Sequence, residues 1–333
     1  MCVVMDETCG VWLKHCIKVV YMSHRRFLRA DHPYRRNKKA FDGTIETRHA
    51  PKVRTGEHIF KMVKNLKVVL GKGKGSTKST NSLFKKRSIF WDLPYWVDLM
   101  VRHAIDFMHV EKNVCESLVG TMADISGKTK DTLNARMDLE DMKLRKDLHH
   151  KVLENGSKKL PTASYTLSKQ EKISMCKCLH EIKVPSGYSA NVSRFINMKT
   201  LKVRFKKSHD CHILMIQLLP IAIRGILLDK VRDTIIKLCS FFNAVSQKVV
   251  DPKKLTKLQD DLIHTMCNLE TIFPPSFFDI MPHFLVHIVH EMKYLGPVFL
   301  HQMYPFERFV TILKMYVRNR SRLEGCMAQG WAI

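Results

Sequence analysis

The sequence lacks the signals that mark secreted and membrane proteins. Residues 1–16 include two acids and no uninterrupted apolar core, so we expect no signal peptide there. The most apolar run, residues 213–228, is broken by Gln217, Pro220 and Arg224, which argues against a bilayer span. The ten cysteines form no CxxC pair. Reduced thiols in an intracellular protein are therefore expected.

Glycine-based catalytic and nucleotide-binding signatures are missing too. No G-x-S-x-G elbow and no dinucleotide-binding glycine fingerprint occurs. The string from Gly71 to Ser82, GKGKGSTKSTNS, lacks the spacing of a phosphate-binding loop. Its composition predicts a flexible basic linker instead.

Acidic residues are scarce relative to basic ones. The chain has 56 Lys and Arg against 31 Asp and Glu, a formal net charge of +25. Residues 1–87 hold 21 of the basic residues and 6 of the acids. Such a balance favours a polyanionic partner. Nucleic acid is the first expectation, an anionic membrane surface is the second, and an inert basic surface is the remaining alternative.

The basic segment at residues 23–50 interleaves arginines with aromatics. Its proline and glycine predict loop with short elements. One interpretation is DNA binding, with guanidinium groups on phosphates and aromatic rings on bases. The other is a solvated basic loop whose aromatics anchor it to the core. The residues concerned are Arg25, Arg26, Phe27, Arg29, Tyr34, Arg35, Arg36, Lys38, Lys39 and Phe41.

Hydrophobic periodicity predicts a mainly α-helical protein. Apolar residues recur at three and four along most of the carboxyl half, and alternating strand patterns are nearly absent after residue 120. A strand or helix is expected at 11–21. Ser168 and Glu171 form a capping-box pattern that begins another helix. The further expected helices span 56–69, 139–144, 218–248, 254–269, 277–292 and 306–319.

The stretch from Ser88 to Cys115 is rich in aromatics, histidines and acids. Its apolar spacing from Leu99 to Val114 predicts a helix with one polar edge. Asp106 and His109 are three residues apart and would share a face of that helix. Three roles fit this pair: a metal-proximal pair, an acid–base pair and an internal structural hydrogen bond, of which the last is the commonest for such spacing.

Two other groups have the spacing of metal ligands. His283, His287 and His290, with Glu291 beside them, would lie along one predicted helix. The segment from His209 to His212 brings four ligand-type side chains together before the helix at 218. Buried, hydrogen-bonded histidines explain the first group as well, and neighbouring residues rarely all reach one ion. Whether either group binds metal stays open.

Several long motifs resemble CACTA-type (En/Spm-like) DNA transposases of plants. The block LPYW at 93–96 with RHAIDFMHVEKNV at 102–114 carries the first resemblance. HRRFLRADHPYRR at 24–36, GKTKDTLNARMDLEDMKLRKDLH at 127–149 and KSHDCHILMIQLLPIAIRGIL at 207–227 carry the second. From residue 218 onward, LETIFPPSFFDIMPH at 269–283 and MYPFER at 303–308 resemble a domain of unknown function found in the same proteins.

The resemblance implies an RNase H-like DDE transposase that cuts and rejoins DNA with Mg²⁺. Asp106 and His109 match the family's D-x-x-H pair, and either Glu291 or Glu307 matches its last catalytic acid. The implied fold is a helical carboxyl half that follows a partial α/β remnant. The expected division is 1–70, part of the transposase domain, 71–87, a linker, 88–217, the rest of that domain with a helical insertion, and 218–333, the domain of unknown function.

The sequence also departs from the family. The family's first two catalytic Asp precede its HRRFL segment, and the 23 residues before that segment here give no matching context for Asp6. Gln302 and His301 replace the family's Trp and Arg, and Pro282 replaces a Leu. Because two-metal chemistry needs converging carboxylates, we expect an amino-terminally truncated, catalytically inactive chain that binds no Mg²⁺.

Three functions follow as expectations. The first is a nuclear DNA-binding protein, whose contacts include Lys85, Lys86 and Arg87 as well as the basic segment. That tripeptide would also suit a nuclear localisation signal. The second is an active Mg²⁺-dependent nuclease. The third is an interaction module in which the helical carboxyl half binds a partner or self-associates, with no membrane involved.

Overall fold

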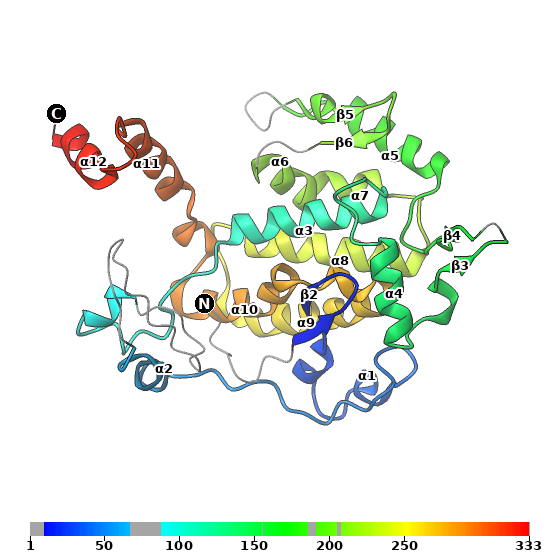
Figure 1. Cartoon of the computed structure of the whole chain (residues 1–333), viewed down its shortest axis with the longest axis horizontal. Helices are drawn as coiled ribbons and strands as arrows, with labels where there is room; N and C mark the ends of the chain where they lie inside the picture. The colour runs from blue at the N-terminus through cyan, green and yellow to red at the C-terminus, as the bar shows by residue number, and fades with distance from the viewer. Residues whose placement is uncertain (1–9, 67–87, 155, 186–190, 205–207, 333) are drawn as a thin grey trace.

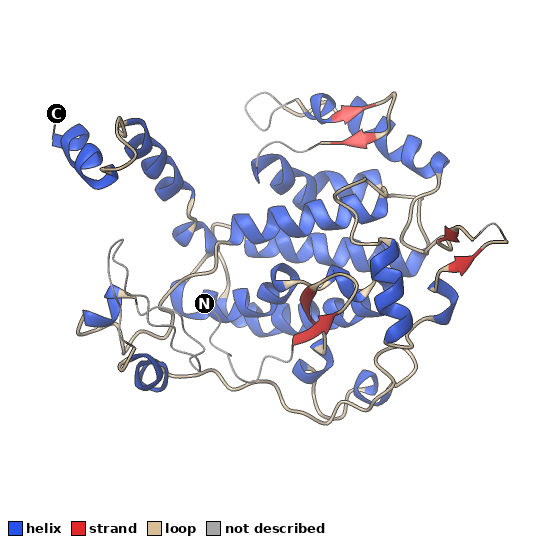
Figure 2. Ribbon diagram, viewed as in Figure 1, coloured by secondary structure: helices blue, strands red, loops and turns tan. Residues whose placement is uncertain are grey.

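The computed structural model describes residues 10–66, 88–154, 156–185, 191–204 and 208–332. These residues are mainly helical, as predicted, with a body of packed helices and a carboxyl-terminal pair of helices that projects from it (Figures 1 and 2). Among them, no helix combines the length and apolar character needed to cross a bilayer.

The core of the body is built from seven helices. They are α3 (Phe107–Met122), α5 (Lys169–Glu181), α6 (Ser208–Ile213), α7 (Leu219–Ala222), α8 (Asp229–Val245), α9 (Leu255–Ile272) and α10 (Ile280–Leu295). Helix α3 packs against both α6 and α10, and α9 packs against both α8 and α10. Apolar residues at helical spacing face inward, so one continuous core joins these elements.

Short 3₁₀ helices flank α9 and α10. η6 (Pro252–Lys254) leads into α9, η7 (Pro275–Phe277) precedes α10, and η8 (Val298–His301) follows it. The predicted helices at 254–269 and 277–292 are thus confirmed as α9 and α10, with small shifts at their ends. The capping box is also confirmed, because Ser168 and Glu171 exchange hydrogen bonds at the start of α5.

The expected single helix at 218–248 was wrong. α6 continues through a π-helical turn, η5 (Leu214–Leu218), into α7, and the chain then breaks before α8 begins. In the break, Gly225 has φ of +77° and Leu227 has φ of +64°, which a continuing right-handed helix cannot accommodate.

An antiparallel hairpin precedes the body. β1 (Gly10–Leu13) pairs with β2 (Lys18–Tyr21), so the predicted element at 11–21 is two strands joined by a turn. The backbone N–H of Tyr21 donates to the carbonyl of Phe278 at 2.7 Å. The segment after it folds as η1 (His24–Phe27), α1 (Pro33–Arg36) and loop, as its proline and glycine predicted.

Smaller elements complete the middle of the chain. α2 (Gly56–Val63) is shorter than the helix expected at 56–69, and with η2 (Ile89–Asp92) it forms a small apolar cluster apart from the main core. α4 (Leu133–Asp141) lies earlier than the helix expected at 139–144, because Lys143 and Arg145 take positive φ. The remaining elements are η3 (Lys146–Leu148), β3 (Lys151–Val152), β4 (Lys158–Lys159), η4 (Val192–Phe195), β5 (Ile196–Asn197) and β6 (Lys202–Val203).

The strands of the described residues form three separate two-stranded ribbons. They do not join into a common sheet, so an RNase H-like remnant stays a prediction. The basic linker expected at Gly71–Ser82 and the basic run Lys85–Arg87 lie outside the described residues.

The carboxyl-terminal arm consists of α11 (Tyr304–Met315) and α12 (Leu323–Ala332). α11 agrees with the helix predicted at 306–319 except at its ends. The arm leaves the body beyond η8, and its two helices pack on each other (Figure 1).

Candidate functional site

The carboxylate of Asp106 caps helix α3. Its Oδ1 accepts a hydrogen bond from the backbone N–H of His109 at 3.1 Å. This bond satisfies one of the free N–H groups in the first turn, so Asp106 has a structural role as the N-cap. It bonds to the backbone of His109 from a position before the helix, whereas the spacing predicted two side chains on one helix face. Asp106 is half-buried and His109 is exposed.

The helix predicted across 99–114 therefore begins only at Phe107. Before it, the chain is held by aromatic packing instead of helical hydrogen bonds. The rings of Phe90 and Trp96 stack with their centroids 4.8 Å apart, and His103 lies edge-on to both. Apolar spacing alone does not distinguish such a cluster from one face of a helix.

A pocket with a volume of about 190 Å³ lies between the start of α3 and helix α10. Glu291 reaches it from α10, and its Oε2 accepts the backbone N–H of Ile105 at 2.8 Å. Burial raises the pKa of Glu291 above its ordinary value. The lining residues are His103, Ala104, Ile105, Asp106, His109, Val110, Met281, Phe284, His287 and Glu291.

The pocket distinguishes Glu291 from Glu307, the two alternatives for the last catalytic acid. Glu291 lines it together with Asp106 and His109. Glu307 lies instead on α11 of the arm, where it is exposed. Of the four candidate catalytic residues, the structure brings together three.

The donor set of this pocket fits Mg²⁺ poorly. Magnesium prefers several oxygen ligands, chiefly charged carboxylates, in octahedral geometry. Only Asp106 and Glu291 line the pocket with carboxylates, and each already accepts a backbone N–H. Burial also favours the neutral form of Glu291. Within the described ranges, no group of three or more His, Cys, Asp or Glu residues could hold a metal ion.

Of the histidines of α10, His283 is buried and His287 half-buried, and these two approach each other. His283 and His287 approach through their Nε2 atoms at 3.2 Å, and His283 stacks on Tyr21 with centroids 4.9 Å apart. Burial lowers the pKa of His283 to about 2 and that of His287 to about 4. His290 lies edge-on to Tyr294. Both members of the His283–His287 pair are therefore neutral near neutral pH.

In the segment 209–212, one histidine pairs with a carboxylate of another helix. His212 Nδ1 lies 2.9 Å from an oxygen of Glu111, which is buried on α3. Burial raises the pKa of Glu111. For His212, burial opposes charging, but the bond to Glu111 outweighs it and raises the pKa. Asp210 and Cys211 are buried, so this segment packs α6 onto α3.

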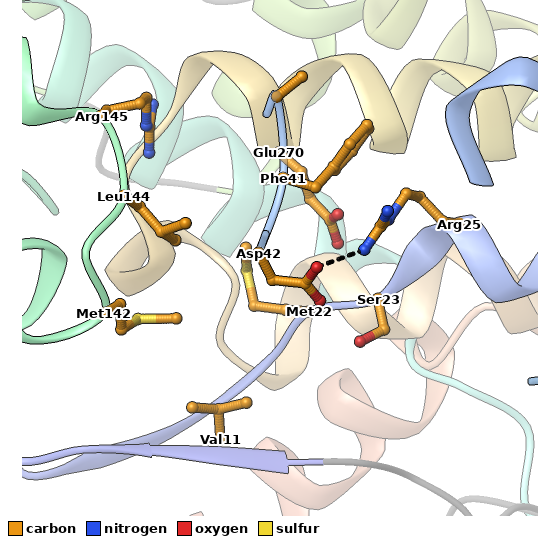
Figure 3. A pocket seen from close by; sticks show the side chains of 11 residues that line it. Val11, Met22, Ser23, Arg25, Phe41, Asp42, Met142, Leu144, Arg145 and Glu270 are labelled. Carbon is orange, nitrogen blue, oxygen red and sulfur yellow. Dashed lines mark hydrogen bonds and ion pairs between the residues drawn. The ribbon is translucent and has the colours of Figure 1, made fainter. Parts of the chain in front are cut away.

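Three arginines assigned to DNA binding lie inside the fold. Arg25 is 1% exposed; it donates to Asp42 Oδ1 at 2.6 Å and to the carbonyl of Thr44 at 3.1 Å. Its guanidinium lies over the ring of Phe41, 4.5 Å from the centroid. Figure 3 shows the ion pair between Arg25 and Asp42. Both residues line a small cavity of about 70 Å³, which Glu270 also lines.

The other two buried arginines bind backbone carbonyls. Arg35 donates to the carbonyls of Arg25 and Leu28, each at 3.0 Å, and to that of Arg48. Arg26 donates to the carbonyl of His49 at 3.0 and 3.1 Å. These side chains fold the segment on itself, and a DNA phosphate cannot reach them as placed.

The aromatics of the segment anchor it to the body, the second of the two interpretations given above. Tyr34 donates its hydroxyl to Asn268 Oδ1 at 2.8 Å and stacks on His264 with centroids 5.1 Å apart. Phe41 packs with Ile263 and Cys267 of α9. These rings are not free to stack on bases.

Four of the cations assigned to DNA binding remain at the surface. The side chain of Arg29 is 88% exposed, with Asp31 3.4 Å away. Arg36, Lys38 and Lys39 are also exposed.

Sequence analysis missed two buried carboxylates that hold the amino-terminal part in place. Glu270 of α9 accepts from the backbone N–H of His24 at 3.1 Å and lies 2.5 Å from its Nδ1. Asp138 of α4 accepts the backbone N–H groups of His15 and Cys16, each at 2.9 Å. Asp138 belongs to a run of charged residues at 138–147, a pattern that is typical of a solvated face, yet its side chain is buried. An acid within the apolar run LETIF was the only signal for Glu270.

Comparison with known families matches two parts of the chain. The model of the transposase family tnp2 matches residues 1–66. The model of a domain of unknown function, DUF4218, matches residues 245–333. Together these matches support a transposase-derived protein. No curated protein and no solved structure matches the chain.

The matched parts of this transposase-derived protein divide the candidate residues. The basic segment lies within the tnp2 match, whereas Glu291 and Glu307 lie within the domain of unknown function. Asp106 and His109 lie in neither. The two matched parts also contact each other, because Tyr21, His24 and Tyr34 bond to Phe278, Glu270 and Asn268.

Proposed function

We propose that this transposase-derived protein binds DNA through the surface cations of its amino-terminal segment. The observation that carries the proposal is the position of Arg29, Arg36, Lys38 and Lys39, which are exposed on the part that matches the tnp2 family. The buried arginines serve as the frame that holds this surface in shape. The net charge of +25 adds a long-range attraction to any polyanion.

The contact is expected to be with phosphates rather than bases. Because Tyr34 and Phe41 pack on α9, the segment offers charge without free aromatic rings. Phosphate contacts fix position on DNA but carry no sequence information directly. Binding should therefore be strongly salt-dependent and weakly sequence-dependent.

The test is to measure DNA affinity as a function of salt. Replacing Arg29, Arg36, Lys38 and Lys39 with Ala should flatten the slope of log K against log salt by about one unit per lost contact. A matched control replaces four exposed lysines elsewhere, Lys151, Lys158, Lys159 and Lys253, with the same change in net charge. No binding at about 50 mM salt, or equal losses in both variants, would refute the assigned surface.

We further propose that the protein does not cut DNA. The support is the Asp106 pocket, whose carboxylates are few and hydrogen-bonded to backbone, and where burial raises the pKa of Glu291. Magnesium titration by calorimetry, beside a plasmid-nicking assay, should give no response. The competing function, an Mg²⁺-dependent nuclease, requires nicking that Asp106→Ala abolishes.

Origin and cellular location follow as part of the same proposal. The motifs quoted above support descent from a CACTA-type (En/Spm-like) element of a plant, and a DNA-binding role fits a nuclear protein. A fluorescent fusion that stays outside the nucleus would contradict the location.

A second candidate function is an interaction module. The exposed apolar side chains of α11 and α12 favour it, since they lie on an arm outside the core. This function does not depend on DNA binding, and both can reside in one chain.

A further inference from the structure

The arm, α11 with α12, exposes many large apolar side chains. Eight of its apolar residues are between 41 and 72% exposed, and half of these eight are aromatic. The eight residues are Tyr304, Phe306, Phe309, Val310, Ile312, Met315, Leu323 and Trp331. If these aromatic and aliphatic side chains are taken as about half exposed, the apolar surface that they leave in water is roughly 600 Å². That is the upper end of what a monomer usually leaves bare, and most of the roughly 800 Å² that one partner contributes to a stable interface.

α12 covers only one side of the apolar face of α11. Phe309 meets Trp331 edge-on with centroids 5.2 Å apart. At Gly330 an added Cβ would lie 2.4 Å from the ring of Tyr316, so the helices approach closely there. Beside this contact, Phe306 is 64% exposed and Val310 is 43% exposed, and Leu313 is half-buried.

The apolar residues beside the contact with α12 have the spacing of a helix-pairing seam. Phe306, Val310 and Leu313 follow one another at intervals of four and three, which is the repeat that keeps apolar side chains on the line between two packed helices. Such a seam is completed by a second helix of similar length and apolar spacing.

The charges beside the seam make it complementary to a copy of itself. Glu307 and Lys314 are seven residues apart, so they lie on the same flank of α11. Across the described residues, neither takes part in an ion pair. If a second α11 packs antiparallel with Val310 opposite Val310, then Phe306 comes within one residue of the level of Leu313, and Glu307 comes within one residue of the level of Lys314. A two-fold axis repeats each contact, which gives two such ion pairs.

We propose that α11 binds the α11 helix of a second copy of this chain in antiparallel orientation. The proposal rests on the second candidate function, the interaction module, and specifies its partner and its geometry. The arm projects from the body, so two arms can meet while each body keeps its own core (Figure 1). α12 then covers the outer flank of each α11, and the four helices of the two arms share one apolar centre.

The first test is the mass of the purified chain by light scattering, without DNA and at high salt. The expected mass is twice 38.8 kDa. Phe306→Glu should give a monomer. Val249→Glu is the matched control: it also places an acid on an exposed apolar residue, 88% exposed, but on the body. It should leave the dimer intact. Because DNA is absent, the result is independent of the DNA-binding proposal.

The second test exchanges the flanking charges. Glu307→Lys and Lys314→Glu each place like charges opposite one another twice per dimer, and each should weaken the dimer about tenfold. The double variant restores opposite charges and should restore the wild-type dissociation constant. Only a partner that carries the same two residues in reverse order gives this pattern, so the exchange identifies the second copy.

Three results would overturn the proposal. One is a wild-type chain that stays monomeric up to about 100 μM, since a specific dimer should form well below that. Another is a Phe306→Glu chain that remains dimeric. The third is a double variant that dimerises as weakly as the single ones.

Discussion

Arg25 and Arg29 are chemically identical residues four positions apart, and the structure gives them opposite roles. Replacing Arg25 with Met keeps much of the side-chain volume but removes the guanidinium. It removes a charged hydrogen bond to Asp42, one to the carbonyl of Thr44, and the contact with the ring of Phe41. A charged hydrogen bond contributes roughly 1.5–3 kcal/mol and a desolvated ring contact up to about 2 kcal/mol.

These contributions overlap, and Asp42 is 41% exposed, so water can hydrate its carboxylate after the change. We therefore expect Arg25→Met to lower the free energy of unfolding by about 3 kcal/mol. Arg29→Met should change it by less than about 0.5 kcal/mol, because that side chain is almost wholly in water. Its expected effect is on DNA affinity and its salt dependence instead.

Urea unfolding followed by circular dichroism measures the first quantity, and DNA titration at fixed salt measures the second. Both variants have the same net charge, so a general electrostatic effect on DNA binding would appear equally in each. The reasoning is refuted if Arg25→Met unfolds at the wild-type urea concentration. It is also refuted if Arg29→Met destabilises the fold as much as Arg25→Met does.

Two further predictions concern α3 and α10. Asp106→Ala should lower stability by roughly 0.5–2 kcal/mol through loss of the N-cap, and Asp106→Asn should retain most of it, as thermal unfolding can show; equal losses would exclude the capping role. As pH falls from 7 to 5, the unfolded chain protonates His283 and His287 near their ordinary pKa of 6.5, whereas the folded chain, with pKa values of about 2 and about 4, does not. Each of the two histidines should therefore lower the free energy of unfolding by roughly 2 kcal/mol at pH 5. His287→Gln should remove about half of this loss between pH 7 and pH 5, which urea titrations at both pH values can measure.

The helices of the carboxyl half were predictable because their evidence is local. α9 buries apolar residues at helical spacing. Ser168 and Glu171, three positions apart, form a capping-box pattern that marks the start of α5. The break before α8 was harder to see. Gly225 marks it in sequence, but the positive φ of Leu227 depends on how the chain packs at that point.

The candidate site was less predictable, because its partners are far apart in the chain. Asp138 bonds to residues more than 120 positions away, and Glu270 to one 246 positions away. A carboxylate in such a contact looks the same in sequence as one in water. The same reason led to the assignment of Arg25 and Arg35 to DNA, since composition gives the charge of a segment but not the direction in which its side chains point.

The bonds from Tyr21, His24 and Tyr34 to α9 and the turn after it have a consequence for how such a protein changes over time. The tnp2-like part and the domain of unknown function share an interior, so neither can be exchanged for that of a distant relative without matching changes in the other. A version of the amino-terminal part without a histidine at position 24 would leave the buried carboxylate of Glu270 without its contact to that ring. We therefore expect the two parts to be inherited as one block, with substitutions at His24 and Glu270 occurring together.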